Sequence, residues 1–177
     1  MSRLTDEKEA FSRPTREQVN MRVALEFSKL STCLKLRTGA VLVKNTRIVS
    51  TGYNGVFSGD EHCNLYWKRR YDAGEWPQYS TFWDFIKSPE WGELHHNWAR
   101  HHEPHGEINA LLYAAAESGV TTKGAEMYSL YSPCADCAKS LITAKIARVY
   151  YAHVYKSQEG IEILEAHNIP CVHIHVE

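Results

Sequence analysis

The sequence has no long apolar run and almost no net charge. None of its apolar stretches approaches the ~18 residues that span a bilayer, and the polar stretch from Ser2 to Arg16 lacks the apolar centre of a signal peptide. With 20 Lys and Arg against 21 Asp and Glu, the formal net charge is -1. Such a balance offers no basic field to attract polynucleotides or anionic membranes. We therefore expect a cytoplasmic protein with a small substrate and with neither nucleic acid nor membrane as a partner.

No repeat, low-complexity tract or long linker divides the 177 residues, and 44% hydrophobic residues are ordinary for one core. These features predict a single domain over residues 1–177. Cysteines are few and odd in number, which in a reducing compartment indicates metal ligands or buried thiols before disulfides. Ten histidines strengthen the metal interpretation. The five cysteines are Cys33, Cys63, Cys134, Cys137 and Cys171.

Periodicity predicts an α/β fold. Thr15 and Gln18 form a capping box that opens a helix over residues 15–30. The β-rich runs 40–43 and 47–51, separated by a short polar turn, predict an antiparallel hairpin. The rest of the chain alternates helices and strands, which implies parallel pairing and a sheet covered on both faces. These elements are helix 106–118, strand 127–131, helix 135–145, strand 148–152, helix 157–167 and strand 171–176.

Residues 56–102 break this alternation. All five tryptophans and many histidines lie in this segment, and its apolar residues follow no clean period. The segment is expected to be an aromatic- and His-rich insertion with few regular elements.

Two motifs carry the chemistry. His105-Gly106-Glu107 is an H-x-E motif, and Pro133-Cys134-Ala-Asp-Cys137 is a P-C-x-x-C motif. Together, in this order, they form the signature of zinc deaminases. His105, Cys134 and Cys137 would supply three zinc ligands, which leaves the fourth tetrahedral position open for water, as in catalytic sites.

Glu107 is the polar residue of this set that the metal does not need. In the first turn of the helix that His105 opens, it can face the water and carry a proton to the substrate's ring nitrogen and then to the departing amine. Two thiolates cancel the formal charge of Zn²⁺, so the metal needs help in acidifying its water. The positive ends of the helices beginning near His105 and Cys134 can provide it.

The motif residues resemble those of the deoxycytidylate deaminase family, particularly its phage members. The resemblance rests on the runs 105–110 (HGEINA) and 132–138 (SPCADCA), with 52–55 (GYNG) upstream, and extends from about Val19 to Val176. Pro104 and Gly106 depart from the family's usual residues without touching a ligand. The resemblance implies a three-layer α/β/α cytidine deaminase-like fold with a mixed five-stranded sheet. It also implies a homo-oligomer, often a hexamer.

The resemblance further implies a reaction and a substrate. It predicts the zinc-dependent hydrolysis of dCMP to dUMP and ammonia, which supplies dUMP for thymidylate synthesis. Asn54 is expected to line the nucleotide pocket and Tyr155 to contact the substrate. Activation by dCTP and inhibition by dTTP, with Mg²⁺ accompanying the triphosphate, are expected from Gly52, Tyr53 and Arg22.

The cysteines and histidines outside the motifs predict a second, structural zinc. A metal clip would hold an irregular insertion on the domain, because ligand bonds replace missing core contacts. Spacing alone does not choose the ligands. Matching to phage-type deaminases selects Cys33, Cys63, His95 and Glu103, with His101 or His102 as substitutes for Glu103; the alternative is buried thiols beside a solvated histidine cluster.

Two other functions share these features. A deaminase of tRNA or single-stranded DNA carries the same zinc signature, and the aromatic insertion could stack bases. A zinc-stabilised interaction domain without activity is the other alternative. Glu107 argues against the second, because a structural zinc has no use for an unliganded carboxylate beside an open coordination position.

Overall fold

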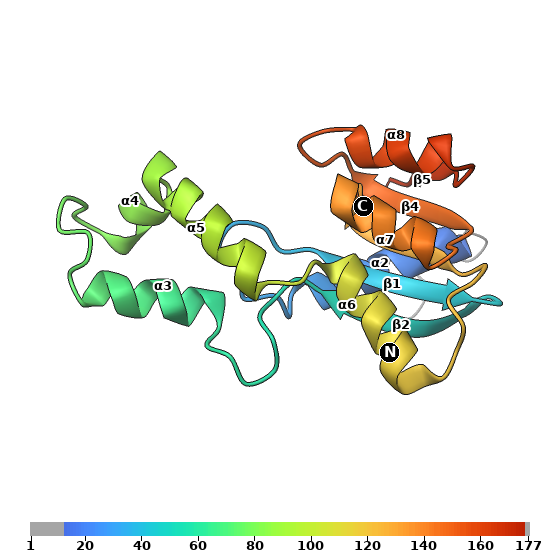
Figure 1. Ribbon diagram of the computed structural model, residues 1–177, viewed down its shortest axis with the longest axis horizontal. Coiled ribbons are helices and arrows are strands. Elements are labelled where there is room, and N and C mark those ends of the chain that lie inside the picture. The colour runs from blue at the N-terminus through green and yellow to red at the C-terminus, as the bar shows by residue number, and fades with distance from the viewer. Residues whose placement is uncertain (1–12, 176–177) are drawn as a thin grey trace, which may run out of the picture.

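The computed structural model describes residues 13–175, apart from the side chain of Ser118. The charged residues that precede Arg13, and Val176 at the end of the last expected strand, lie outside the described part. Figure 1 shows two unequal bodies: a sheet flanked by helices, and a helical lobe that projects from one end of the sheet.

The sheet has five strands in the order β2-β1-β3-β4-β5. Its central strand β3 pairs antiparallel with β1 and parallel with β4, so the sheet is mixed, as the sequence predicts. The hairpin β1–β2 turns at Asn45 and Thr46, which both adopt positive φ angles, as the primed turns of tight hairpins require. The strands are β1 Gly39–Lys44, β2 Arg47–Tyr53, β3 Glu126–Tyr131, β4 Arg148–His153 and β5 Cys171–His173.

Four helices cover the sheet in a three-layer arrangement. The expected capping box of Thr15 and Gln18 opens α2 (Arg16–Ser28), whose buried face packs on one side of the sheet. The other side is covered by α6 (Gly106–Tyr113), α7 (Ala135–Thr143) and α8 (Glu159–Ala166). Alternate residues of β1 belong to the two cores: Ala40 and Leu42 face α6, and Val41 and Val43 face α2. This alternation is the two-residue period of a strand buried on both faces.

The predicted helix over residues 106–118 changes its winding near the end. After Tyr113 the chain continues as a single turn of π-helix, η1 (Ala114–Ser118), and stops at Gly119 with φ 61°. The stop at a left-handed glycine is the one expected from the sequence, whereas the π turn carried no signal in the residue pattern.

The lobe corrects the expectation of few regular elements. It holds three helices: α3 (Cys63–Asp72), α4 (Phe82–Ile86) and α5 (Pro89–His102). Their apolar residues follow no simple stripe because aromatic rings from all three helices converge on one small core, where Trp67 and Phe85 are almost fully buried. Local start signals were present, since Thr81 caps α4, and Ser88 caps α5 ahead of Pro89.

Candidate active site

The three predicted zinc ligands meet at the starts of two helices. His105 is the N-cap of α6, Cys134 is the N-cap of α7, and Cys137 lies in the first turn of α7. The Nδ1 atom of His105 lies 3.3 Å from the Sγ atom of Cys137 and 3.5 Å from that of Cys134. One ligand atom from each residue lies within 4.8 Å of the others. Two sulfurs and an imidazole nitrogen at these separations fit a zinc ion, which would complete the set with one further ligand.

Glu107 is buried beside this group. It lies in the first turn of α6, and only 5% of its surface is exposed. Burial raises the pKa of its carboxyl above the usual value, while the nearby His105 opposes that rise. A carboxyl whose environment holds the proton more firmly is suited to accept and return a proton during a reaction near neutral pH.

The ligands shift one another's pKa values in both directions: that of Cys134 is lowered, and those of His105 and Cys137 are raised. The pKa of Cys134 falls to about 4, chiefly because Cys137 donates a hydrogen bond to its sulfur, with His105 as a further donor. The pKa of His105 rises to about 9, chiefly through the same contact with Cys134. Cys134 is therefore a thiolate, the form that ligates metal, whereas His105 and Cys137 would release protons when a metal binds.

Asn54 lies just after β2 and is buried, but its amide is engaged with the backbone. Its Oδ1 atom accepts from the Thr38 amide at 2.8 Å, and its Nδ2 atom donates to the Leu36 carbonyl at 2.8 Å. The backbone N–H of Asn54 also donates to the Thr38 carbonyl at 3.2 Å. Asn54 thus fixes the segment 36–38 against the end of β2.

Tyr155 follows β4 and is half-buried. Its amide nitrogen donates to the Oγ atom of Ser132 at 2.8 Å, two residues before the ligand Cys134. The bond ties the loop that carries Tyr155 to the start of α7. The role of Ser132 was not singled out from the sequence, although the residue belongs to the run 132–138 that contains the P-C-x-x-C motif.

The residues expected to bind effectors do not form one group. Gly52 is buried under α6, where an added Cβ would overlap the carbonyl oxygen of Gly106 and come within 2.5 Å of the Ala110 amide nitrogen. Tyr53 is partly exposed, and its carbonyl accepts from Asn109 at 2.7 Å. Arg22 lies on the exposed face of α2.

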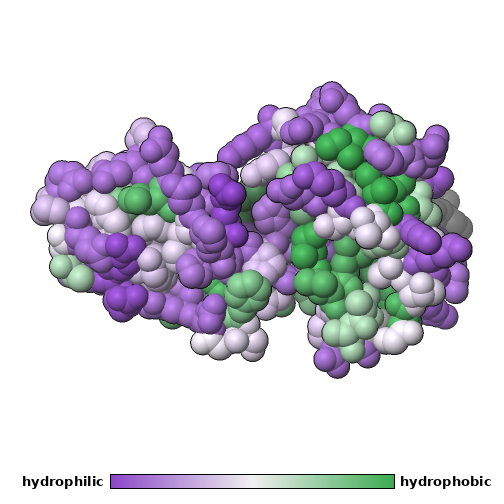
Figure 2. Space-filling view, in the orientation of Figure 1, coloured by the Kyte–Doolittle hydropathy of each residue, from purple (hydrophilic) through white to green (hydrophobic). Residues whose placement is uncertain are grey.

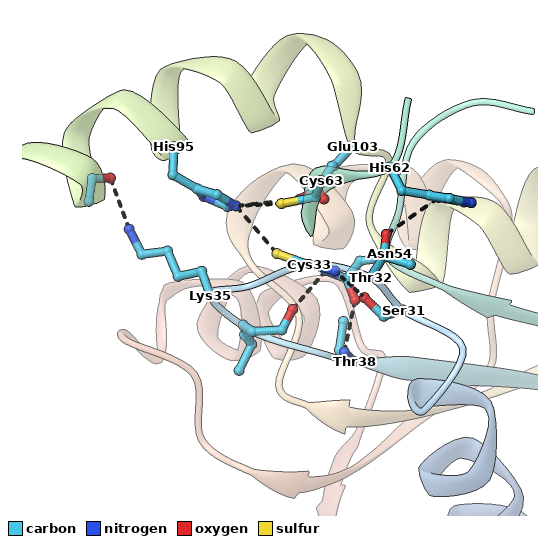
Figure 3. A network of polar contacts seen from close by, with 12 residues as sticks. Ser31, Thr32, Cys33, Lys35, Thr38, Asn54, His62, Cys63, His95 and Glu103 are labelled. Carbon is cyan, nitrogen blue, oxygen red and sulfur yellow. Dashed lines mark hydrogen bonds and ion pairs between the residues drawn. The ribbon is translucent and has the colours of Figure 1, made fainter. Parts of the chain in front are cut away.

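A second group of possible ligands joins the lobe to the sheet (Figure 3). The Nε2 atom of His95 lies 3.4 Å from the Sγ atom of Cys33 and 3.5 Å from that of Cys63. The Oε2 atom of Glu103 lies 4.0 Å from the same nitrogen. One ligand atom from each of these four residues lies within 4.8 Å of the others. We expected Cys33 to lie at the end of the first helix. It lies instead in the segment after α2, because that helix ends at Ser28.

The chemistry of this second group also fits a cation. Among the described residues, the buried Oε1 atom of Glu103 has no hydrogen-bond partner. Burial raises the pKa of Glu103 to about 8, and the neighbouring Cys33 adds to the rise. The hydrogen bond from Cys63 lowers the pKa of Cys33, whereas that of Cys63 is raised. A buried carboxyl with an unpaired oxygen beside two thiols is costly unless a positive ion compensates it.

The surface is indented between the lobe and the sheet. Figure 2 shows this indentation between the two bodies, and the lobe presents a mostly hydrophilic surface on this side. Most of the lobe's aromatic side chains are turned inward, with Trp67, Trp76 and Trp91 at most 8% exposed. The exceptions are Trp83, at 62%, and Phe57, at 56%.

Solved structures share this fold. The dCMP deaminase of cyanophage S-TIM5, solved in complex with dCMP and dUMP, is 28% identical and superposes with a TM-score of 0.67. The match covers 92% of this chain and 99% of that one. The architecture and the site together define a deaminase of the cytidine deaminase-like fold.

Sequence comparison gives the family. Residues 14–153 match the family model for the cytidine and deoxycytidylate deaminase zinc-binding region. The deoxycytidylate deaminase of Enterobacteria phage T2 is 35% identical over 154 residues, covering 79% of this chain and 81% of the relative. That of Mycobacterium phage D29 is 31% identical over 140 residues, covering 79% and 96%. The chain belongs to the cytidine and deoxycytidylate deaminase family, whose members are hydrolytic enzymes. Within residues 13–175, no helix is long and apolar enough to cross a membrane.

Proposed function

We propose that this chain hydrolyses the exocyclic amine of dCMP, giving dUMP and ammonia, and so supplies dUMP for thymidylate synthesis. The observation that carries the proposal is the placement of Glu107, a buried carboxyl, beside the three ligands His105, Cys134 and Cys137. The relatives named above as deoxycytidylate deaminases support the choice of substrate.

The chain's own residues divide the work. His105, Cys134 and Cys137 would hold a zinc ion, which, when bound, supplies the Lewis acidity that makes water a nucleophile at neutral pH. Glu107 takes one proton from the attacking water and passes it to the ring nitrogen of cytosine. It then takes the remaining proton of the hydroxyl that has added to the carbon and gives it to the departing amine. Water adds to the carbon that loses the amine, so dCMP and water become dUMP and ammonia.

Asn54 and Tyr155 are proposed to bind the nucleotide. Asn54 spends one amide hydrogen on the Leu36 carbonyl, and an amide has two, so the second is available for a sugar hydroxyl. The backbone N–H of Tyr155 is bonded to Ser132, so the Tyr155 backbone lies beside the segment that leads into the ligand Cys134.

A nucleic-acid base deaminase is the nearest competing function. It would need exposed aromatic faces on which unpaired bases stack. The lobe instead uses most of its rings for its own core: the rings of Trp76 and Phe85 stack with centroids 4.2 Å apart, and Trp67 contacts five other aromatic residues of the lobe edge-on or tilted. Together with the net charge of -1, this packing favours a small nucleotide over a polynucleotide. An inactive interaction domain has no use for the buried Glu107.

One assay separates these functions. Ammonia release should be measured from dCMP, deoxycytidine, cytidine and an RNA hairpin at equal concentrations. We expect dCMP to be preferred. Preferential release from the hairpin would identify a nucleic-acid deaminase, and no release from any substrate by zinc-loaded protein would favour the interaction domain.

A structural zinc at Cys33, Cys63, His95 and Glu103 is the second part of the proposal. The support is the convergence of two sulfurs, one imidazole nitrogen and an unpaired carboxylate oxygen within 4.8 Å. The purified protein should contain two zinc atoms per chain. Cys63→Ser should lose one, while Lys68→Ala, on the exposed side of the same helix, should lose none. One zinc per chain in the unmodified protein would show that packing alone holds the lobe.

Regulation and assembly complete the proposal. dCTP with Mg²⁺ is proposed as activator and dTTP as inhibitor, acting near Gly52, Tyr53 and Arg22. Homo-oligomerisation is supported by two large apolar side chains exposed on α6, Leu112 at 61% and Tyr113 at 58%, and a hexamer is the size that the family resemblance implies. Light scattering coupled to gel filtration measures the mass directly, and Leu112→Glu should shift it downward if this face is covered in the oligomer.

A further inference from the structure

The lobe is attached to the sheet by its connecting segments and not by a broad interface. Among the described residues, α3, α4 and α5 have no extensive packing against the strands or against α2, α6, α7 and α8. Figure 1 shows the same arrangement, with the lobe standing away from the sheet. Whatever fixes the segments at the base of the lobe therefore fixes its position.

The four residues of the second group lie on those segments. Cys33 is on the segment between α2 and β1, Cys63 is the first residue of α3, and His95 and Glu103 lie on α5 and at its end. Figure 3 shows their side chains converging from these separate parts of the backbone. A single ion held by them would cross-link every covalent connection between lobe and sheet.

The last of these connections leads straight into the catalytic site. Glu103 is the C-cap of α5 and His105 is the N-cap of α6, with only Pro104 between them. Two successive Cα–Cα steps span at most about 7.6 Å. Pro104 restricts the link further, because its ring fixes φ and constrains the residue before it. Little slack remains between a ligand of one group and a ligand of the other.

Backbone contacts around the link transmit its position. The Pro104 carbonyl accepts from the Gly55 amide at 3.4 Å, beside Asn54, which holds the segment 36–38. Gly106 is packed closely, and a Cβ placed on it would lie 3.4 Å from the Tyr53 Cα atom and 3.6 Å from the Thr38 carbonyl oxygen. The start of α6 is therefore enclosed by the same segments that carry Cys33 and Cys63.

We propose that the second group of ligands is a positioning device for the catalytic centre: when a metal holds Glu103, it sets the place of His105 and thereby the affinity and reactivity of the catalytic metal site. Glu103 and Pro104 are positioning residues in this account and touch no substrate. The inference rests on the proposed function for the presence of a second zinc, but not for the identity of the substrate.

The test compares zinc release with turnover. Wild-type protein, Cys63→Ser and the control Trp83→Ala, an exposed lobe residue away from both groups, are mixed with a chromogenic chelator. Changes to groups that orient metal ligands typically cost about 10- to 100-fold in metal affinity or activity. We expect the catalytic zinc, which is the zinc left in Cys63→Ser, to be released about ten-fold faster than the more slowly released zinc of the wild type. The kcat of Cys63→Ser should be about ten-fold lower than that of the wild type, and its KM should be nearly unchanged. Trp83→Ala should match the wild type.

A second variant keeps every ligand and changes only the link. Pro104→Gly should bind two zinc atoms and unfold at a similar urea concentration, yet release its catalytic zinc several-fold faster, because the link is now flexible. The rate of zinc release from Pro104→Ala should lie between those of the wild type and Pro104→Gly. This variant keeps the test informative if Cys63→Ser does not fold.

Three results would overturn the inference. Unchanged release of the remaining zinc and unchanged kcat in Cys63→Ser would make the second group a clip for the lobe alone. Wild-type release in Pro104→Gly would exclude transmission through the link. A single zinc in the unmodified protein would remove the second metal itself. If dCMP proves not to be the substrate, the zinc-release measurements still decide the matter.

Discussion

Glu103 and His105 are separated in the chain by a single residue, yet their side chains belong to two different groups of metal-ligating residues. The carboxylate of Glu103 points to Cys33, Cys63 and His95, and the imidazole of His105 to Cys134 and Cys137. The turn between α5 and α6 therefore joins the lobe to the reaction centre.

Glu107→Gln should abolish most of the activity and keep the catalytic zinc. The substitution preserves size and removes the group that accepts and returns protons, so turnover should fall by at least about 100-fold. Steady-state ammonia release and zinc analysis of the same sample measure both effects. Loss of zinc with activity would indicate that Glu107 acts on the metal site; turnover close to that of the wild type would refute its role as the proton carrier.

Tyr155→Phe should weaken the use of dCMP without affecting zinc content. The tyrosine hydroxyl is the proposed contact, and the bond that positions the loop comes from the backbone, so the variant keeps its fold. We expect KM for dCMP to rise several-fold, in line with the loss of about one hydrogen bond. Tyr151→Phe, on β4, is a matched control. Equal kcat/KM for dCMP and deoxycytidine in the wild type would contradict the substrate assignment and leave the zinc chemistry standing.

Gly52→Ala should destabilise the protein and disturb the start of α6. A methyl group there would overlap the Gly106 carbonyl, and overpacking of this kind typically costs about 1–3 kcal/mol. Gly55→Ala is the control, because its Cβ would come no closer than 3.7 Å to another atom. Urea unfolding compares the two. A response of Gly52→Ala confined to effector binding, with normal stability, would support a regulatory role for Gly52 instead of a packing one.

Rate against dCMP concentration should be sigmoidal and should respond to triphosphates. dCTP with Mg²⁺ should make the curve more nearly hyperbolic, and dTTP should displace it to higher dCMP concentrations. Arg22→Ala tests one proposed contact. Its side chain is exposed on α2, so its loss should leave the basal rate unchanged. Hyperbolic curves unmoved by either triphosphate would show an unregulated enzyme.

Without metal, Glu103 should make the folded protein less stable as pH rises. Burial raises its pKa to about 8 in the folded chain from an ordinary value of 4.5, so between these values the folded state holds a proton that the unfolded state has lost. Stability then falls with increasing pH, by up to about 1.4 kcal/mol per unit for one proton. Glu103→Gln has no carboxyl at this position to titrate. Urea unfolding of this variant and of the wild type in EDTA should therefore be compared from pH 5 to 8, because the difference between their midpoints reports the titration of Glu103. A constant difference would show that Glu103 is solvated in the metal-free protein.

Much of the fold could be predicted because its signals are local. The capping box at Thr15, the turn at Asn45 and the glycine stop at Gly119 all stand where the pattern placed them. The residue pattern predicted the antiparallel hairpin and the parallel pairing of the later strands, since the two-residue and 3.6-residue periods are read directly from neighbours in the chain. The mixed five-stranded sheet followed from the family resemblance. The lobe was missed because its helices bury aromatic rings against one another and not against a flat sheet, so no single face is apolar.

By itself the sequence determined the chemistry: the residue types and order of His105, Glu107, Cys134 and Cys137 specify a zinc deaminase, because ligand identity and motif spacing are local properties. Only the tertiary structure decided which remaining side chains act together. It brought Cys33 and His95 to 3.4 Å across 62 positions of sequence, and it committed the Asn54 amide to the backbone at Thr38 and Leu36. Contacts of that kind depend on how separate segments pack, so they cannot be predicted from the periodicity within one segment.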